Sequence, residues 1–334
     1  MNCATRQKIA VITGVTGQDG SYLAEYLLKK GYYVIGIKRR ISHLGSHERL
    51  ASIYNNPNFT LVYGNMHDAS SIFSIINKYK PDEFYHLAAQ SHVRVSFEVT
   101  EETLDTVAKS TLRILNAIKE VSPHTRFYQA SSSEMYGVAT MPQNGYNETS
   151  QMIPASPYAC AKLFAHNIVR NYRESYGLHA SSGILFNHES FRRGETFVTK
   201  KIVMAAAAIK LEIQEKLELG NLNAKRDWGF APDYVSGMHL MLQQGEPDDY
   251  VLATGETHSV FEFLKEVFDH ADLDVGKHVT INDRLFRPEE VPVLLGNPAK
   301  AKERLGWESR TKFKDLAKLM YEEELESLLN AQPA

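Results

Sequence analysis

Residues 8–21 read KIAVITGVTGQDGS, an apolar run that leads into glycines at positions 14, 17 and 20. Ile9 to Ile12 predicts a buried strand, and a helix is expected from about Ser21 to Lys30. Glycines between a strand and a helix permit a tight turn and let the backbone approach a pyrophosphate, which the helix N-terminus then faces. The alternative is an ordinary turn whose glycines are incidental. We expect a dinucleotide loop formed by Gly14, Thr16, Gly17, Gln18, Asp19 and Gly20.

Outward from this loop, the alternation of strand and helix continues to about residue 187. Strands are expected at 33–37, 60–63, 83–87, 126–130 and 180–186, and helices at 70–78, 103–120 and 157–176. Such alternation predicts an α/β fold, a Rossmann-type doubly wound parallel sheet covered by helices. We assign residues 1–187 to a dinucleotide-binding domain that also carries the catalytic residues.

Beyond residue 187 the alternation loosens. The pattern predicts a helix over 198–210, a strand over 216–219 and a closing helix over 311–329, with segments rich in Asn, Pro and Gly between them. We expect residues 188–334 to form a smaller C-terminal α/β lobe that mainly binds the substrate. Because no low-complexity linker separates the two parts, we expect them to be interleaved.

Composition and charge exclude several classes of protein. The 37 Lys and Arg nearly balance the 40 Asp and Glu, so there is no electrostatic footprint for nucleic acid. The longest apolar run, 202–209, is far shorter than the roughly 20 residues that cross a bilayer, and 1–7 lacks the apolar core of a secretory signal. The two cysteines, Cys3 and Cys160, suit neither a disulfide framework nor a multi-cysteine metal site. We expect a cytoplasmic protein without a metal.

Basic residues follow the second expected strand, where the sequence reads Lys38, Arg39, Arg40. A site for NAD usually places an acidic residue at this point to accept from the ribose hydroxyls. A guanidinium there pairs bidentately with a 2′-phosphate instead. Arg39 and Arg40 therefore favour NADP, although the same residues also suit a solvated basic loop.

Tyr158 and Lys162 lie four residues apart, which places a phenol and an ammonium on one face of the expected helix. A lysine beside a nicotinamide ribose lowers the pKa of the phenol, so that tyrosinate can remove a hydroxyl proton. Ser132 and Glu134 follow the fifth strand, and extended geometry would point both to the same side. Glu134 would add a second acid and base, which extends the chemistry to elimination of water. Alternatively, Glu134 is a carboxylate at the start of a helix or on the protein surface.

Several longer stretches carry a family resemblance. They include GVTGQDGSYLAEYLLKKGY (14–32), TRFYQASSSEMYG (125–137), SPYACAK (156–162), GILFNHES (183–190) and FRPEEV (286–291). The chain resembles the extended short-chain dehydrogenase/reductases and, within them, is similar to the GDP-mannose 4,6-dehydratase family over nearly its whole length. The resemblance implies a GDP-sugar substrate, NADP, and a homodimer or homotetramer in which the Arg39 and Arg40 loop reaches a neighbouring subunit.

The resemblance also implies roles for single residues. It implies that Ser132, Glu134, Tyr158 and Lys162 are catalytic. Further cofactor contacts would come from Asn65, Met66, Leu87, Ala88 and Ala89. Substrate contacts would come from Ser91, Asn187, Lys201, Arg226, Arg287 and Glu290. Two arginines and a lysine can neutralise a diphosphate, while Asn and Glu can bind a sugar or guanine.

Four positions depart from the family pattern. Phe191 stands where the family usually has proline, Ala155 where it has arginine, Asn65 where it has an acidic residue, and Val107 lies in an altered helix. We expect Phe191 to add bulk beside the substrate pyrophosphate and Asn65 to weaken an adenine contact. The departures leave three alternatives open: a related GDP-sugar such as a GDP-heptose as substrate, epimerase or 4-keto reductase chemistry, and a cofactor-binding assembly subunit without activity.

Overall fold

A seven-stranded parallel sheet forms the centre of the computed structural model, which describes residues 6–40, 48–286 and 289–331. The strand order is β11-β6-β5-β4-β1-β2-β3, and every pairing is parallel. The strands are β1 (Ile9–Thr13), β2 (Tyr33–Lys38), β3 (Phe59–Tyr63), β4 (Glu83–His86), β5 (Arg126–Ser132), β6 (Ala180–Leu185) and β11 (Asp249–Leu252). This order confirms the predicted Rossmann-type sheet.

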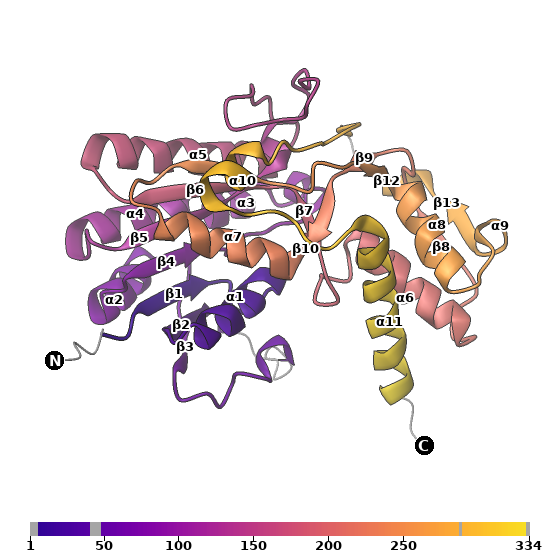
Figure 1. Cartoon of the computed structure of the whole chain (residues 1–334), viewed down its shortest axis with the longest axis horizontal. Coiled ribbons are helices and arrows are strands. Elements are labelled where there is room, and N and C mark those ends of the chain that lie inside the picture. Colours follow the sequence, from indigo (N-terminus) through magenta and orange to yellow (C-terminus); the bar gives the residue numbers. More distant parts are fainter. Residues whose placement is uncertain (1–5, 41–47, 287–288, 332–334) are drawn as a thin grey trace.

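Helices cover both faces of the sheet, which explains why its strands are apolar throughout rather than alternating. On β1, Ala10 and Ile12 pack toward one helical layer, while Val11 packs toward the other. The first layer comprises α1 (Gln18–Lys29), α7 (Ala231–Gln243) and α10 (Ala299–Leu305). The second comprises α2 (Ala69–Tyr79), α4 (Ser110–Val121) and α5 (Pro157–Tyr176). Figure 1 shows the two layers on either side of the strands.

The helix expected over 103–120 is interrupted. It consists of α3 (Thr100–Leu104), a π-helical segment over Asp105–Lys109, and α4. The Asp105 carboxylate pairs with Arg113 at 2.9 Å and with Lys109 at 3.3 Å, and thus ties the π-helical segment to the helix that follows. Periodicity predicts one helix here because a π-helical turn shifts the register without ending the apolar face.

The sheet also uses residues beyond 187. β11 pairs with β6, and α7 packs against α1 beneath the sheet. β11 is not predicted by the sequence pattern, and its four residues follow an acidic, proline-containing loop. The two parts of the chain are interleaved in this sense, and the division at residue 187 remains a prediction.

A smaller lobe packs at one end of the sheet, to the right in Figure 1. Its own apolar core joins α6 (Val198–Lys210), α8 (Val260–His270) and α11 (Phe313–Ala331) around Trp228. The expected helix over 198–210 is thus confirmed, and the expected closing helix over 311–329 is observed as α11. The remaining short elements are β7 (Asn187–Glu189), β8 (Leu217–Leu219), β9 (Lys225–Arg226), β10 (Trp228–Phe230), β12 (His258–Ser259), β13 (Val279–Ile281) and α9 (Val275–His278).

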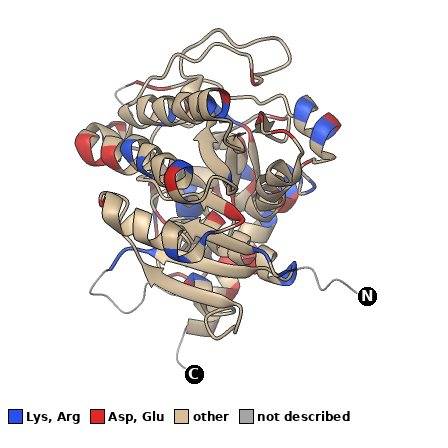
Figure 2. Ribbon diagram, turned by 90° about the vertical axis from the view of Figure 1, so that its left-hand side faces the viewer, with Lys and Arg blue, Asp and Glu red and all other residues tan. Residues whose placement is uncertain are grey.

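Charge and hydropathy of the folded chain agree with the balanced composition. On the face shown in Figure 2, lysine and arginine lie interspersed with aspartate and glutamate. Among the described helices, none combines the length and the apolar character that a membrane-spanning helix needs.

Candidate active site

A cavity of about 730 Å³ opens at the carboxyl ends of the sheet strands, between the sheet and the smaller lobe. In open α/β sheets this edge is where ligands bind. Nearly all of the residues that the sequence analysis singled out line it. They are Gly14, Thr16, Gly17, Gln18, Asp19, Gly20, Arg39, Asn65, Met66, Leu87, Ala88, Ala89, Ser91, Ser132, Glu134, Tyr158, Lys162, Asn187, Lys201, Arg226 and Glu290. Arg40 is exposed and is not among the lining residues, and Arg287 lies outside the described residues.

The glycine loop after β1 has the geometry of a close backbone approach. Gly14 has a φ of +68°, a conformation that favours glycine. A Cβ at Gly20 would lie 2.3 Å from the Gly14 carbonyl oxygen, so the turn tolerates no side chain there. Gly17 is the N-cap of α1 and has no side chain to accept from the first-turn amides. These amides therefore suit an anion at the start of the helix.

Arg39 extends from the end of β2 to the mouth of the cavity. Its guanidinium lies 3.9 Å from the Glu102 carboxylate on α3, and both side chains are largely exposed. Arg49, which the sequence analysis did not single out, also lines the cavity and donates to the Thr16 carbonyl at 3.3 Å. Two guanidinium groups thus line the cavity and are candidates to bind a 2′-phosphate.

The start of α5 is fixed by local sequence. Ser156 is the N-cap, and its hydroxyl accepts from the Ala159 amide at 3.1 Å. Pro157 occupies the first turn, where its missing N–H costs no hydrogen bond. The Tyr158 amide donates to the Ser96 hydroxyl at 3.2 Å, which holds this first turn against the preceding segment.

Tyr158 and Lys162 are both buried, and burial governs their ionisation. Burial raises the pKa of Tyr158 to about 12, although a hydrogen bond with Ser132 lowers it and the Glu134 charge raises it further. Burial alone therefore opposes formation of the tyrosinate, and the lowering expected from Lys162 beside a nicotinamide ribose stays a prediction. The Lys162 ammonium donates to the Ala130 carbonyl at 2.6 Å and lies 5.7 Å from the Tyr158 ring centre. Burial also lowers the pKa of Lys162 to about 8, while the Asp19 charge raises it.

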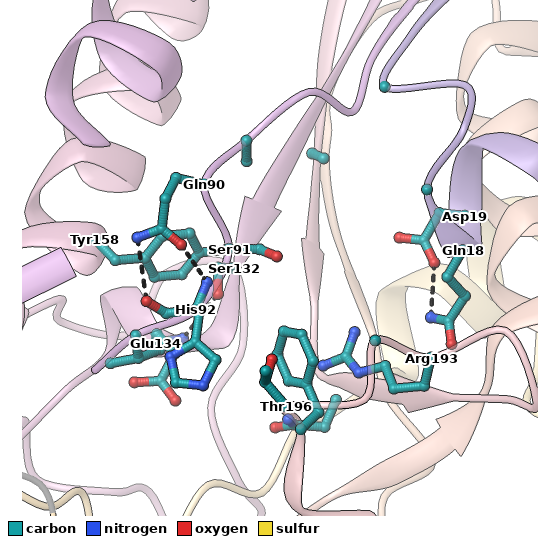
Figure 3. Close-up of a pocket in the computed structure, with 18 of the residues that line it drawn as sticks. Gln18, Asp19, Gln90, Ser91, His92, Ser132, Glu134, Tyr158, Arg193 and Thr196 are labelled. Carbon is teal, nitrogen blue, oxygen red and sulfur yellow. Dashed lines mark hydrogen bonds between the residues drawn. The ribbon is translucent and has the colours of Figure 1, made fainter. Parts of the chain in front are cut away.

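Ser132 and Glu134 both line the cavity, but not for the geometric reason expected. β5 ends at Ser132, and Ser133–Met135 form a 3₁₀ turn rather than a continued strand. The Ser132 hydroxyl accepts from the Glu134 amide at 3.2 Å and so caps this turn. The expectation of extended geometry is therefore wrong. The turn nevertheless brings Glu134 to the same side of the cavity as Ser132 and Tyr158 (Figure 3).

A segment after β4 contributes side chains that the sequence analysis did not single out. The Gln90 side chain accepts from the His92 amide at 2.7 Å and donates to the His92 carbonyl at 3.2 Å, as Figure 3 shows. The His92 ring lies 5.6 Å from the Phe197 ring, centre to centre, and both residues line the cavity. Both residues belong to the stretch LAAQSHV (87–93), but no sequence motif predicts a functional role for Gln90 or His92 individually.

An ion pair connects the glycine loop to β7. The Asp19 carboxylate lies 2.8 Å from Nε2 of His188. Arg193, which follows shortly after, pairs with Glu189 at 3.1 Å and lies over the Phe197 ring at 3.7 Å. The sequence analysis assigned no role to His188 or Arg193, although their stretch NHESFRRG has an unusual density of ionisable groups.

Lys201, Arg226 and Glu290 line the cavity from the smaller lobe, whereas Ser91 follows β4 and Asn187 lies on β7. The Arg226 guanidinium pairs with the Glu290 carboxylate at 2.9 Å and also donates to the Val291 carbonyl at 2.8 Å. Lys201 donates to the Glu218 carbonyl at 2.7 Å. These contacts place Arg226 beside Glu290, Lys201 lines the same cavity, and the roles of all three toward a substrate remain predictions.

Comparison with known proteins agrees with the residues of this site. A family model described as GDP-mannose 4,6 dehydratase matches residues 11–320. The chain belongs to the GDP-mannose 4,6-dehydratase family. It is 52% identical over 330 residues to GDP-mannose 4,6 dehydratase 1 of Arabidopsis thaliana, covering 96% of this chain and 90% of that protein. It is 47% identical over 353 residues to GDP-mannose 4,6 dehydratase of Homo sapiens, covering 98% and 94%.

Solved structures with low sequence identity share the fold. RMD from Pseudomonas aeruginosa complexed with NADPH superposes with a TM-score of 0.79 at 21% identity, covering 96% of this chain and all of that one. The dTDP-glucose 4,6-dehydratase of Bacillus anthracis in complex with NAD superposes with a TM-score of 0.83 at 21% identity, covering 97% and 98%. Both superpositions cover nearly the whole chain, so the two solved structures share its overall fold.

The departures from the family pattern lie mostly outside the cavity. Phe191 is not among the lining residues, and its ring packs beneath the Lys200 ammonium at 4.3 Å. The expectation that Phe191 adds bulk beside the substrate is therefore wrong, because its side chain turns toward α6. Ala155 packs against the apolar cluster around Tyr136, and Val107 is buried beside Ala161. Only Asn65 lines the cavity.

Proposed function

We propose that the chain converts GDP-mannose to its 4-keto-6-deoxy form, with NADP as the cofactor. The proposal rests on one observation, the convergence in a single cavity of the glycine loop, the Tyr158 and Lys162 pair, and Glu134. The relatives named GDP-mannose 4,6 dehydratase, which match almost the full length of the chain, support the same substrate.

The residues of the cavity fit a dinucleotide with a 2′-phosphate. The turn at Gly14 and Gly20 leaves space that a Cβ would fill, and the first-turn amides of α1 suit the pyrophosphate. Arg39, at the end of β2, and Arg49, beside the glycine loop at Thr16, supply guanidinium groups to the same cavity, which suits NADP better than NAD. Bound there, NADP would supply a hydride acceptor for C4 of the sugar and a hydride donor for C6, so that it would be regenerated in each turnover.

Tyr158 and Ser132 would act on the hydroxyl at C4. The Tyr158 phenolate takes the O4 proton, and Ser132 donates a hydrogen bond to the same oxygen. Because burial raises the pKa of Tyr158, the site must supply positive charge to make the phenolate accessible. The Arg193 charge lowers the pKa of the phenol, and we propose that the buried Lys162 ammonium, 5.7 Å from the ring centre, supplies further positive charge.

Glu134 would carry out the elimination. A carbonyl at C4 acidifies the proton on C5, and the Glu134 carboxylate takes that proton. The same proton then goes to the C6 hydroxyl, which leaves as water. A simple reductase or epimerase needs Tyr158 but has no use for a carboxylate at this point, so Glu134 favours the dehydratase over those alternatives.

The smaller lobe would hold the GDP moiety. Arg226 and Lys201 lie on its wall of the cavity and would neutralise the diphosphate, together with Arg287. Asn187 and Glu290 offer hydrogen bonds to the sugar or guanine. The Arg226 contacts with the Glu290 carboxylate and the Val291 carbonyl orient the guanidinium.

A homodimer is the simplest assembly that the surface supports. Leu104 on α3 and Phe164 on α5 are 42% and 45% exposed, and Cys160 is exposed one turn before Phe164. The two helices pack side by side, so these side chains extend one apolar strip over both. We infer that two copies of the chain associate through this strip, as a dimer or as half of a tetramer.

The sparse cysteines support a reducing cytoplasm as the location.

The variant Glu134→Gln tests the role of the carboxylate. It keeps the shape and a hydrogen-bonding amide but cannot take a proton. We expect water elimination from GDP-mannose to fall by about 10² to 10⁴-fold, while oxidation at C4 continues and reduced cofactor accumulates on the enzyme. The measurement is stopped-flow absorbance of reduced cofactor alongside mass spectrometry of the sugar nucleotide. Glu98→Gln, an exposed glutamate outside the cavity, is the control. Elimination at the wild-type rate by the Glu134 variant would refute this role.

A further inference from the structure

The His188 ring contacts an acceptor oxygen at each of its two nitrogens. Nδ1 lies 2.7 Å from the Phe186 carbonyl oxygen, and Nε2 lies 2.8 Å from Oδ2 of Asp19. A carbonyl and a carboxylate only accept hydrogen bonds, so both contacts are favourable only if both nitrogens carry hydrogen. A neutral imidazole has one N–H and would turn a lone pair toward one of these oxygens. The geometry therefore corresponds to an imidazolium.

Burial of the pair makes the charge of each partner depend on the other. The side chains of His188 and Asp19 are 12% and 24% exposed. Burial disfavours the charge on His188, but the charge and hydrogen bond of Asp19 outweigh burial and raise the pKa of His188. Burial likewise opposes ionisation of Asp19, and His188 more than offsets it, lowering the pKa of Asp19 to about 2.

Asp19 lies where a dinucleotide would meet the protein. It is in the first turn of α1, directly after the glycine loop, and it lines the cavity. A lone carboxylate at this position would compete with a phosphate for the first-turn amides and repel it. Pairing with His188 cancels that charge.

Hydrogen bonds of the neighbouring Gln18 side chain also connect the glycine loop, which follows β1, to β7. The Gln18 side chain donates to Asp19 at 3.0 Å and to the His188 carbonyl at 3.0 Å, and it accepts from Ser190 at 2.8 Å. These bonds join the glycine loop to β7, which also carries Asn187. The position of β7 therefore depends on the state of the loop that faces the cofactor.

We propose that protonated His188 is a positioning residue for dinucleotide binding, which neutralises Asp19 and holds the glycine loop against β7, so that cofactor affinity falls when His188 loses its proton. This inference rests on the proposed use of NADP. Deprotonation would remove the cation hydrogen-bonded to Asp19, leaving only the charges of Arg193 and Lys162 to offset the carboxylate beside the cofactor phosphates, and would break one of the two ring contacts.

Other groups around His188 set the direction of the effect. Asp19 on α1 favours the imidazolium, whereas the Arg193 guanidinium, from the segment after β7, opposes it. From α7, the Tyr234 ring stacks on the His188 ring with centres 4.8 Å apart. Tyr234 stays neutral, because burial raises its pKa well above the ordinary value. Since the pKa of His188 is raised, its proton is present below that pKa and is lost as pH rises through it.

The test measures the dissociation constant of NADPH by fluorescence titration from about pH 6 to about pH 9. We expect wild-type affinity to weaken toward high pH by on the order of tenfold. His188→Gln, which can donate a hydrogen bond but cannot hold a charge, should show the weak affinity at every pH. Asp19→Asn combined with His188→Gln should return close to the affinity of the wild type at low pH and keep only the pH dependence that Lys162 imposes, because no carboxylate remains at position 19.

Two further measurements separate the outcomes. His239→Gln, at a buried histidine on α7 outside the cavity, should keep the wild-type pH dependence. In the ¹⁵N-histidine-labelled full chain, the resonances missing from His188→Gln should show imidazolium shifts at about pH 7. A neutral tautomer there, or unchanged NADPH affinity in His188→Gln, would overturn the inference while leaving the NADP proposal intact. No NADPH binding at any pH by the wild type would instead refute the NADP proposal.

Discussion

The ammonium of Lys162 is buried between α5 and the end of β5, where its hydrogen bond goes to the Ala130 carbonyl. Burial lowers its pKa to about 8 from an ordinary value near 10.5. The folded protein therefore binds this proton less tightly than the unfolded chain, so the contribution of Lys162 to stability rises with pH between those two values. At neutral pH the buried charge of protonated Lys162 lowers the free energy of unfolding, whereas the proposed reaction requires that charge.

Lys162→Met makes this conflict measurable. Methionine fills a similar volume without a charge, so we expect the free energy of unfolding at neutral pH to increase by about 1 to 3 kcal/mol. Turnover should fall by at least about 100-fold, because the positive charge beside the phenol is lost. Denaturant unfolding and initial rates on GDP-mannose test both effects. Lys210→Met, at the exposed end of α6, should change neither, and a less stable Lys162→Met protein would contradict the account.

Residue spacing predicted which groups meet but not how they ionise. The four-residue separation of Tyr158 and Lys162 placed both on the inner face of α5. The direction of the Tyr158 pKa depends on how much protein covers the phenol, and that coverage comes from segments distant in sequence. Asp19 was predicted as a loop residue, but its partner His188 lies 169 positions later, beyond the reach of any local pattern.

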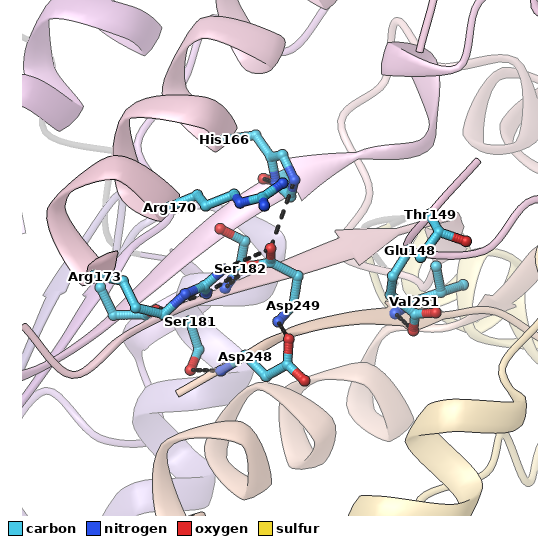
Figure 4. A network of polar contacts seen from close by, with 12 residues as sticks. Glu148, Thr149, His166, Arg170, Arg173, Ser181, Ser182, Asp248, Asp249 and Val251 are labelled. Atoms are coloured by element: carbon cyan, nitrogen blue, oxygen red, sulfur yellow. Dashed lines mark hydrogen bonds and ion pairs between the residues drawn. The ribbon is translucent and has the colours of Figure 1, made fainter. Parts of the chain in front are cut away.

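At the scale of secondary structure, α5, β6 and β11 are joined by a buried charge network, shown in Figure 4. Arg173 on α5 forms two hydrogen bonds of 2.9 Å with the Asp249 carboxylate on β11. The Ser182 amide on β6 donates to the same carboxylate at 3.3 Å, and His166 lies 3.8 Å from it. The network attaches the last strand of the sheet to the helix that carries Tyr158.

Asp249→Ala removes the acceptor of this network. Because Arg173 would remain buried without its partner, we expect a loss of about 3 to 5 kcal/mol in unfolding free energy. Arg173 lowers the pKa of Asp249 against the effect of burial, so the wild-type contribution is present above the ordinary carboxyl pKa and is lost as pH falls through the lowered one. Chemical denaturation across pH tests both statements. Arg170→Ala, which breaks an exposed pair with Glu174, should leave the midpoint unchanged, whereas equal effects of the two variants would contradict the prediction.

The elements themselves divide into those that sequence predicts and those that it does not. The strands from β1 to β6 are apolar runs bounded by turn residues, and the boundaries of α5 follow from Ser156, Pro157 and Gly177. β11 was missed because Asp249 begins a run of only four residues, too short for a periodicity signal. The 3₁₀ turn at Glu134 was not predicted because it is only three residues long and is capped by the hydroxyl of Ser132, the last residue of β5.

At the scale of the molecule, a parallel sheet and a smaller lobe enclose one cavity, and residues from both halves of the sequence line it. The sequence predicted this general plan. It could not predict that α7 and β11 return to the sheet, because that arrangement depends on packing against α1 and β6. The balanced net charge of −3 likewise concealed the cluster of arginine and lysine around the cavity.

Assembly is the prediction that belongs to this scale. Phe164→Glu places a charge in the apolar strip of α3 and α5. We expect the wild type to be oligomeric by light scattering and the variant to have half of its mass, a monomer from a dimer or a dimer from a tetramer. Phe73→Glu, at a phenylalanine on α2 with similar exposure, should leave the wild-type mass unchanged. A Phe164→Glu protein with the wild-type oligomeric mass would place the interface elsewhere.

The most direct test of the proposed reaction follows a deuterium label from C4 of GDP-mannose. The protein is incubated with the labelled substrate and NADP, and the products are analysed by mass spectrometry and NMR. We expect a product lighter by one water, with the deuterium at C6 and no net formation of reduced cofactor, because the hydride leaves and returns within one active site. An isobaric product, deuterium retained in reduced cofactor, or no conversion of GDP-mannose would contradict the assignment as a 4,6-dehydratase.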